Sequence, residues 1–281
     1  MHSVTRSRTS PITEAEQPWQ LRMFRRTLKK QQKLAALLET VGPLDGRHCL
    51  LLTCGDNNGA MNWHFKQHGG HWTWADMEEN SASQIAALTG DPVLNVDKEA
   101  PALALPEQHF DLVMTIDVHE HLEETGTLNR ELARVVKTGG KVIVTTPGGN
   151  PRKLGNRIKQ FLGMRAVDYG HVVDGYSAAD LQGQLRAASL TPSTHSSYSR
   201  FFTEMLELAI NVLYVKLLSK KSKAQVEQGQ IAPQNEEQLH SVQKSYRVYS
   251  LVYPAFWLIS QLDRLLFFTE GYAVIVTAEK E

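Results

Sequence analysis

Cysteine is scarce in this sequence, with two residues, Cys49 and Cys54, among 281. Both lie in or beside an apolar run that is typical of a buried strand. They therefore indicate core packing in a reducing compartment rather than a disulfide framework or a metal site. A chain of this length can bury a full hydrophobic core without disulfides. Residues 1–17 also lack the apolar stretch of a secretory signal, so we expect a cytoplasmic protein.

Net charge is also lacking, because 30 basic and 30 acidic residues cancel. Bulk charge therefore does not favour nucleic acid as a partner. The charges are unevenly distributed: residues 1–36 carry eight Lys or Arg against two Glu, and residues 76–124 carry twelve Asp or Glu against one Lys. A basic arm could contact phosphate or an anionic membrane, although a solvated helix face is the simpler interpretation.

No apolar run is long enough to favour a transmembrane span. The candidate, residues 248–262, has no charged residue over fifteen positions. As a helix it would cover about 22 Å, short of the roughly 30 Å hydrocarbon core of a bilayer. Pro254 interrupts it as well.

Short apolar runs and helical stretches alternate along most of the chain. This rhythm of strand and helix is typical of an α/β domain with a parallel sheet. Residues 1–17 are predicted to be disordered. The pattern predicts strands at 48–53, 71–75, 92–96, 110–116, 140–146, 194–201 and 271–278. It predicts helices at 19–40, 59–67, 81–88, 127–137, 178–188, 205–218 and 248–262.

A turn rich in Gly and Asn, residues 53–59, follows the first strand and opens a helix. Glycines at such a turn let the backbone approach a ligand closely, and the helix N-terminus offers free N–H groups. Asn57 stands where a further glycine could sit between Gly55 and Gly59, and Asn tolerates left-handed backbone angles better than other non-glycine residues. Taken alone, the turn is a weak signal.

Acidic residues stand at the ends of the next strands. Asp76 ends the second strand, Asp97 the third and Asp117 the fourth, with Glu120 and His121 just beyond. Open α/β sheets bind ligands at the carboxyl ends of their strands. An acid some twenty residues after the turn, as Asp76 is, can accept hydrogen bonds from both hydroxyls of a ribose.

The blocks CGDNNG, WAD, NVD, FDLVMTIDVHEHL and LARVVKTGGKVIVTTP together resemble the class I S-adenosylmethionine (SAM)-dependent methyltransferases. The resemblance covers about residues 44–200 and the terminal strand. It implies a seven-stranded Rossmann-like methyltransferase sheet, mostly parallel, whose last strand is antiparallel. It also implies SAM as the cofactor and methyl transfer as the activity.

The resemblance implies which residues bind SAM. The turn would line its methionine and ribose end, Asp76 would hold the ribose, Asp97 would receive the adenine amino group, and Asp117 would start the loop under the methionine. The complete expected set is Gly55, Asp56, Asn57, Gly59, Asp76, Met77, Asp97, Lys98 and Asp117. The chain departs from the family pattern at Asn57 and at Thr53, where an acid usually helps to hold the ammonium group.

Methyl transfer from a sulfonium is an in-line displacement that depends on alignment of the acceptor, and a hydroxyl acceptor also needs a base. The predicted catalytic residues are His119, His171 and Tyr169, which lie past the fourth and fifth strands. Asp117 is a further candidate base, whereas His121 is expected to be structural. Because no carboxylate cluster and no Cys/His ligand spacing stands out, we expect no metal.

Residues 202–268 contain nine of the 22 aromatic residues. They fall between the two strands that suit the family's final hairpin, so they are predicted to form a helical insertion. The insertion could be a lid over an apolar acceptor, a surface lying in a membrane interface, or simply an extra packed subdomain. The expected units are an N-terminal basic arm and helix (1–40), a SAM-binding core (41–201), the insertion (202–268) and the final strand (269–281).

Three functions fit parts of this sequence. The first is a SAM-dependent methyltransferase acting on a small, apolar, lipid-like or isoprenoid acceptor, in the cytoplasm or peripheral to the inner membrane. The second is a binding or scaffold protein that keeps the fold without catalysis, which the residues at positions 53 and 57 suggest. The third, a dinucleotide-dependent dehydrogenase, is disfavoured by Asp97, by the antiparallel last strand and by the lack of a clean G-x-G-x-x-G pattern.

Overall fold

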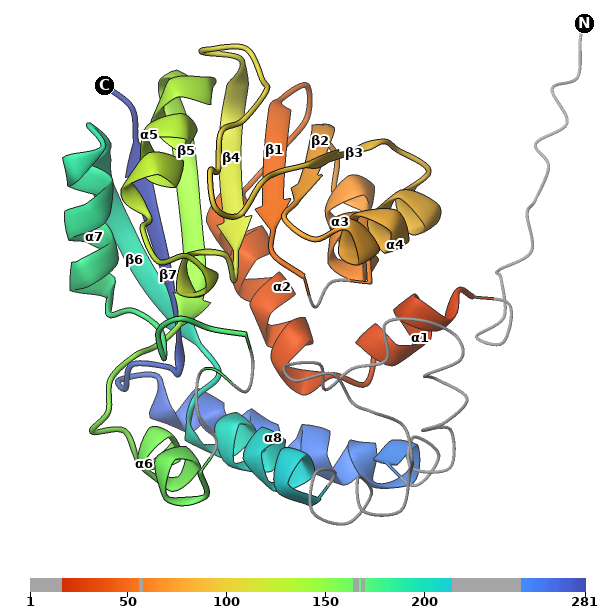
Figure 1. Ribbon diagram of the computed structural model, residues 1–281. Coiled ribbons are helices and arrows are strands. Elements are labelled where there is room, and N and C mark those ends of the chain that lie inside the picture. Colours follow the sequence, from red (N-terminus) through yellow and green to blue (C-terminus); the bar gives the residue numbers. More distant parts are fainter. Residues whose placement is uncertain (1–16, 56–57, 164–166, 168–169, 214–248) are drawn as a thin grey trace, which may run out of the picture.

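The computed structural model describes residues 17–55, 58–163, 167, 170–213 and 249–281. Within them a seven-stranded sheet has the order β3-β2-β1-β4-β5-β7-β6 (Figure 1). Its strands are β1 (His48–Thr53), β2 (His71–Asp76), β3 (Val93–Asn95), β4 (Phe110–Ile116), β5 (Val136–Pro147), β6 (Thr191–Tyr198) and β7 (Ala273–Glu279). In this part of the chain β7 pairs antiparallel with β5 and with β6, and the other pairings are parallel, so the predicted fold class is confirmed.

Helices surround the sheet. They are α1 (Trp19–Phe24), α2 (Leu28–Val41), α3 (Ala60–Gln67), α4 (Glu79–Thr89), α5 (Gly126–Val135), α6 (Leu154–Phe161), α7 (Ala178–Ala187) and α8 (Phe201–Leu213), with 3₁₀ turns η2 (His119–His121) and η5 (Gln261–Leu266). Residues 249–260 are helical as well. Each predicted strand has a counterpart among the observed strands. Helix α6 was not predicted, and residues 136–137, predicted as the end of a helix, begin β5.

The predicted single helix over residues 19–40 is wrong, because the structure has two helices there. The chain leaves the helical conformation at Thr27, which has φ −107° and ψ 95° and is the N-cap of α2. Its hydroxyl donates back to the carbonyl of Met23, four residues earlier. A β-branched residue with a local hydrogen-bonding option can break a helix without glycine or proline.

Two apolar clusters cover the two faces of the sheet. Successive residues of β1 alternate between them, with Leu50 and Leu52 in one cluster and Leu51 in the other. Helices α5 and α7 close the first face, and α2 and α3 close the second (Figure 1). Each fully buried leucine contributes about 2 kcal/mol through removal of apolar surface from water.

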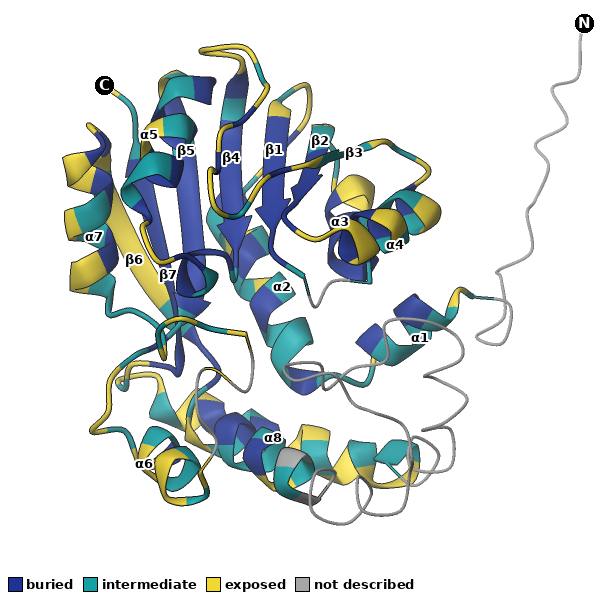
Figure 2. Cartoon of the chain, viewed as in Figure 1, coloured by how far each residue is buried: buried dark blue, intermediate teal, exposed yellow. Residues whose placement is uncertain are grey.

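Burial falls off at the sheet edge. Figure 2 shows the central strands dark blue and much of β6 yellow. The β6 sequence, TPSTHSSY, is largely polar, which suits an edge strand that must not recruit another sheet. By contrast, the last three residues of β1, β2 and β4, at the strand ends where ligand binding is predicted, are buried.

The ends of these three strands lie level. Thr53, the last residue of β1, pairs in register with Asp76 of β2 and with Ile116 of β4. The segments that follow the three strands consequently start from the same edge of the sheet.

The long segment between β6 and β7 is helical where the structure describes it. Helix α8 packs against α2 and α6. The helix at residues 249–260 continues into η5 beneath the sheet (Figure 1). None of the helices in the described ranges has the length and apolar character needed to cross a membrane.

Candidate active site

The turn after β1 depends on two glycines. Gly55 and Gly59 have φ of +66° and +84°, in the left-handed region that favours glycine. A Cβ on Gly59 would lie 3.0 Å from the Cα of Ile85, so glycine also lets α3 approach α4. Asp56 and Asn57, two of the predicted cofactor-binding residues, lie outside the described residues.

Asp76 holds this turn. The residue is fully buried, and its carboxylate accepts hydrogen bonds from the backbone N–H of Gly55 (3.1 Å) and of Glu78 (2.8 Å). It also accepts from the hydroxyls of Ser81 (2.9 Å) and Thr53. Four protein donors therefore occupy the two oxygens, and the role predicted for Asp76 toward a ribose stays a prediction.

Glu78 is a residue that the sequence reasoning missed. It is exposed, and its carboxyl carbon lies 2.9 Å from the point where a Cβ on Gly55 would stand. Its carboxylate is thus placed over the turn, with more solvent access than that of Asp76. The signal that could have found it is its position two residues past the end of β2.

Met77, Asp97 and Lys98 line the same edge. The N–H of Met77 donates to the carbonyl of Thr53 (3.1 Å), which ties the segment after β2 to the end of β1. Asp97 is exposed and accepts the N–H of Glu99 (2.9 Å). Lys98 is half-buried, and its charge acts on Cys54 and lowers the pKa of that thiol against the larger effect of burial, which raises the pKa to about 12.

Asp117 begins the loop after β4 with φ +51°, a conformation that Asp tolerates better than most residues. Its carboxylate forms an ion pair with Lys33, a buried residue of α2. Burial is the largest single effect and raises the pKa of Asp117, but the charge of Lys33, its hydrogen bond and the charge of Lys29 together hold the net pKa below the ordinary value. The pKa of Lys33 is correspondingly raised, against the effect of its burial. Lys33 is a second residue that the sequence reasoning missed.

His119, predicted as a catalytic residue, points into the core. It is fully buried, and its Nε2 lies 2.9 Å from Oδ1 of Asn129 on α5. Burial lowers its pKa to about 4. This geometry does not support the prediction that His119 lies near the transferred methyl group, because the 3₁₀ turn η2 directs it toward α5.

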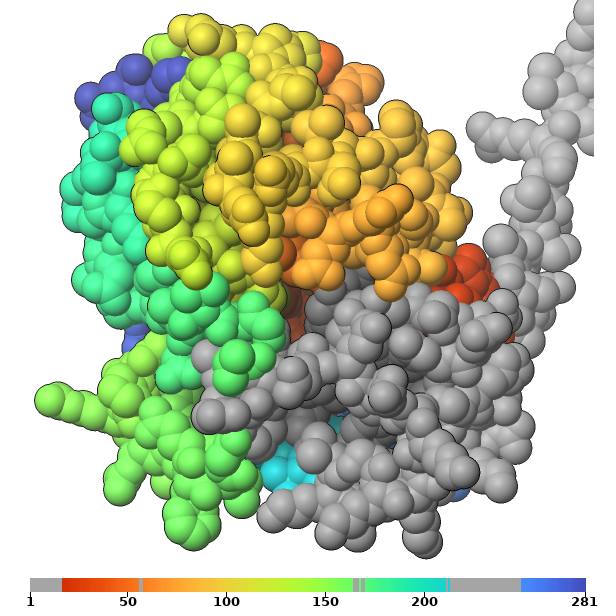
Figure 3. All heavy atoms as spheres, viewed as in Figure 1, coloured from red at the N-terminus to blue at the C-terminus, as the bar shows by residue number. Residues whose placement is uncertain are grey.

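His121 and His171 come together instead, although His121 was expected to be structural. Their ring centroids lie 4.7 Å apart, and Nδ1 of His121 lies 3.0 Å from the carbonyl oxygen of Gly170. The N–H of Val172 donates to the carbonyl of Glu120 (2.7 Å), which ties the two segments together. In the space-filling view, residues that follow position 170 (green) lie against the yellow-green residues around 120–130 (Figure 3).

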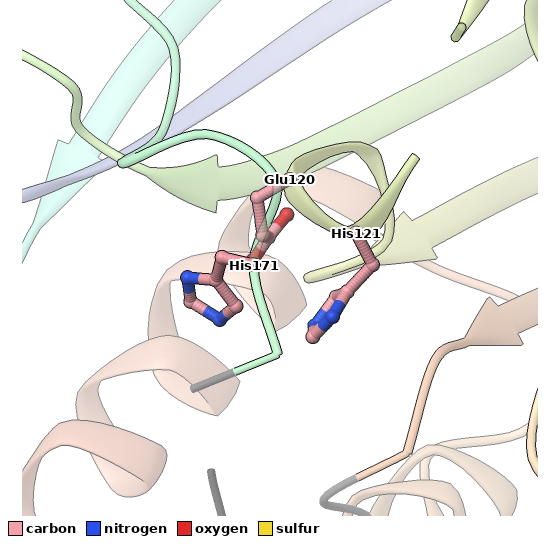
Figure 4. Close-up of side chains that lie close together, drawn as sticks. All are labelled: Glu120, His121 and His171. Atoms are coloured by element: carbon pink, nitrogen blue, oxygen red, sulfur yellow. The ribbon is translucent and has the colours of Figure 1, made fainter. Parts of the chain in front are cut away.

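Glu120 completes this cluster. One donor atom each from Glu120, His121 and His171 lies within 4.8 Å of the others (Figure 4). Burial and the charge of Asp117 raise the pKa of Glu120 well above its ordinary value. Burial and the neighbouring His121 lower the pKa of His171 to about 4. Tyr169, the third predicted catalytic residue, lies outside the described residues.

The expectation that no metal-ligating side chains cluster needs correction. It rested on spacing along the chain, but His171 lies fifty residues beyond His121, and the fold brings them together. The physical reason is the pairing of the segment after residue 170 with η2 through backbone hydrogen bonds, which no local pattern records.

Comparison with known proteins bears on the segment that builds this site. Residues 50–144 match a protein-family model described as a methyltransferase domain. The matched segment runs from β1 into β5, so it contains the glycine turn, Asp76 and the loop that carries Asp117, Glu120 and His121.

Curated relatives match part of the chain. The ubiquinone biosynthesis O-methyltransferase of Leptothrix cholodnii is 29% identical over 119 residues, which cover 41% of this chain and 50% of that protein. The enzyme of the same name from Bordetella avium is 27% identical over 172 residues, covering 57% of this chain and 69% of that protein. The chain spans about half the length of the first curated relatives it matches.

A solved structure supports the fold assignment. The phosphoethanolamine N-methyltransferase 2 of Haemonchus contortus, solved in complex with S-adenosyl-L-methionine, is 16% identical with a TM-score of 0.54. The alignment covers 88% of this chain and 52% of that chain. At this identity the likeness shows the shared Rossmann-like fold.

Proposed function

We propose that this chain, which its matched domain and its fold place among the class I SAM-dependent methyltransferases, is an enzyme that methylates a small apolar acceptor. SAM would bind at the carboxyl ends of β1, β2 and β4, beside the glycine turn. The observation that carries the proposal is the match over residues 50–144, because it includes each of these strand ends and the loops that follow them.

Methyl transfer at this site needs alignment and a proton acceptor. The S–CH₃ bond breaks with its electron pair passing to sulfur, the acceptor oxygen forms the new O–CH₃ bond, and the O–H proton leaves to a base. His171, whose low pKa keeps the imidazole neutral at neutral pH, can take that proton. Because sulfonium is a good leaving group, positioning supplies much of the acceleration.

An oxygen acceptor on an apolar molecule is supported by two observations. The relatives from Leptothrix and Bordetella carry the name of O-methyltransferases of ubiquinone biosynthesis. The helical segment before β7 also exposes large apolar side chains, which suit contact with a lipid-like acceptor or with the inner face of a membrane. The most exposed of these are Leu251 (81%), Leu258 (65%), Leu265 (67%), Phe267 (77%) and Phe268 (73%).

The test combines binding and turnover. Calorimetric titration of the full chain with SAM, S-adenosylhomocysteine and NAD should show heat for the first two and none for the third. Transfer of a labelled methyl group should then be measured to catechols that carry apolar tails of graded length. Faster turnover with longer tails is the expected result, and binding of NAD in place of SAM would contradict the proposal.

A second candidate is a binding or scaffold protein that keeps the fold without catalysis. It is favoured by Asp76, whose carboxylate the protein itself already occupies with four donors. Binding of S-adenosylhomocysteine without methyl transfer to any acceptor of the series would select this candidate.

A further inference from the structure

Three donor side chains from two separate segments converge beside the proposed SAM site. Glu120 and His121 belong to η2, and His171 belongs to the segment after α6 (Figure 4). Their donor atoms lie within 4.8 Å of one another. Ligands of a tetrahedral zinc-like ion at about 2.1 Å lie roughly 3.4 Å apart, so small side-chain rotations close the arrangement.

Glu120 is the observation that points to a ligand. Its side chain is fully buried, and neither carboxylate oxygen has a hydrogen-bond partner within the described part of the chain. Burying a carboxylate without a partner is unfavourable, so buried carboxylates pair with cations or bind metals. The nearby Lys33 is already engaged by Asp117.

His121 is oriented as a metal-binding histidine would be. Its Nδ1 lies 3.0 Å from the carbonyl oxygen of Gly170, which can only accept a hydrogen bond. Nδ1 therefore carries the proton, and Nε2 presents its lone pair. Metal-ligating histidines almost always donate their other ring N–H to a carbonyl or carboxylate in this way.

We propose that Glu120, His121 and His171 bind one divalent transition-metal cation. One carboxylate and two imidazoles are a donor set typical of Zn²⁺, Co²⁺ or Fe²⁺, whereas Mg²⁺ and Ca²⁺ prefer oxygen donors alone. Both histidines are partly exposed, so the cation keeps a position open toward solvent. The cation would hold the acceptor's hydroxyl oxygen and favour its deprotonation. It would thereby replace His171 as the means of removing that proton, because a ligating neutral imidazole has no lone pair left to accept one. This role rests on the proposed function, but the binding itself does not.

Glu120 could instead hold the ammonium group of the SAM methionine, in place of the acid missing at Thr53. The two assignments differ in which ligand Glu120 contacts. A metal cation needs all three side chains, whereas the ammonium group of SAM needs the carboxylate of Glu120 alone.

The test uses the full chain without an affinity tag, freed of metal by a chelator that is then removed. Co²⁺ is titrated and followed by its visible absorption, and Zn²⁺ is measured in competition with a chromophoric chelator. The variants are Glu120→Gln and His171→Gln. The matched control is His109→Gln, which removes an imidazole from the exposed stack of His48, His71 and His109 at the opposite ends of the strands.

We expect one equivalent of Co²⁺ to bind the wild type and the His109 variant, and affinity to fall at least tenfold in both site variants. Equal Co²⁺ binding in the wild type and the His171 variant would overturn the proposal. Loss of S-adenosylhomocysteine binding in the Glu120 variant, with Co²⁺ binding intact, would overturn it in favour of the ammonium assignment. Since S-adenosylhomocysteine is titrated separately, a failed metal site is distinguished from a failed proposed function. If Glu120→Gln does not fold by circular dichroism, His121→Gln takes its place.

Discussion

The hydroxyl of Thr53, at the end of β1, donates a hydrogen bond to the buried carboxylate of Asp76, at the end of β2. The two residues are level in the parallel register of these strands. An acid at position 53, as the resembling family usually has, would place two carboxylates side by side in the core. Thr53, which departs from the family pattern, therefore supplies Asp76 with a hydrogen-bond donor instead of a second negative charge.

Replacement of Thr53 by Asp is expected to destabilise the fold. The new carboxylate would face that of Asp76 without a cation to balance it, at a cost of about 3 kcal/mol in the free energy of unfolding. Thr53→Ser keeps the hydroxyl and should cost less than about 1 kcal/mol. Urea unfolding of both variants measures the difference, and equal stabilities would show that the Thr53–Asp76 contact is unimportant.

Asp76 and Glu78 are expected to separate stability from SAM affinity. Asp76→Asn replaces one accepting oxygen with an NH₂ group that faces other hydrogen-bond donors, so it should cost about 2 kcal/mol of unfolding free energy. Glu78→Gln should leave stability unchanged and weaken SAM binding about tenfold, because an exposed carboxylate over Gly55 can hold a ribose hydroxyl. Calorimetry and urea unfolding measure the two effects. If Asp76→Asn kept normal stability but lost SAM affinity, the result would show that Asp76, and not Glu78, holds the ribose.

Glu204 should make stability depend on acid pH. It is buried on α8 between Lys29 of α2 and Lys159 of α6. Burial raises its pKa, but the charges of Lys29 and Lys159 outweigh this and lower the pKa to about 2. Because the ordinary value is 4.5, the ionised form stabilises the fold above pH 4.5, and this contribution is lost as the pH falls from 4.5 toward 2.

The contribution of Glu204 is about 3 kcal/mol at neutral pH. The gap in unfolding free energy between the wild type and Glu204→Gln should therefore narrow between pH 5 and pH 2.5, as urea unfolding can measure. Glu123→Gln, at an exposed position, serves as the control for removal of a carboxylate from the surface. A gap for Glu204→Gln that does not change with pH would contradict the assignment.

Two exposed apolar residues should attach the chain to membranes. Leu258 and Phe267 are 65% and 77% exposed, and each would contribute about 2 kcal/mol on entering an interface. The double variant Leu258→Glu, Phe267→Glu should co-sediment with phosphatidylglycerol-containing vesicles at least tenfold less than the wild type. Ala187→Glu, on the exposed face of α7, is the control for added negative charge. Equal co-sedimentation of all three proteins would rule out this surface.

Most of the fold could be predicted from the sequence, because its strands are short apolar runs between turn residues. The runs 48–53 and 110–116 are found as strands with the predicted bounds. The break at Thr27 could not be predicted, because a single β-branched residue in an amphipathic pattern does not by itself indicate the end of a helix. Local signals therefore determine where elements form, but they do not determine every point at which an element is interrupted.

The candidate site was predictable only in its chain positions. The acids after β2 and β4 follow from strand ends, which any parallel sheet brings to one edge. The partners of those acids do not follow, since Lys33 lies 84 residues from Asp117. The approach of His171 to His121 depends in the same way on long-range packing, and so does the turn of His119 into the core.

The most direct measurement is a crystal structure of the full chain grown with S-adenosylhomocysteine. Our account predicts electron density for the adenosyl group between the Gly55 turn and the segment that carries Asp97, with the amino-acid end near the loop that begins at Asp117. A cleft without ligand density at saturating concentration, or density at another edge of the sheet, would contradict it.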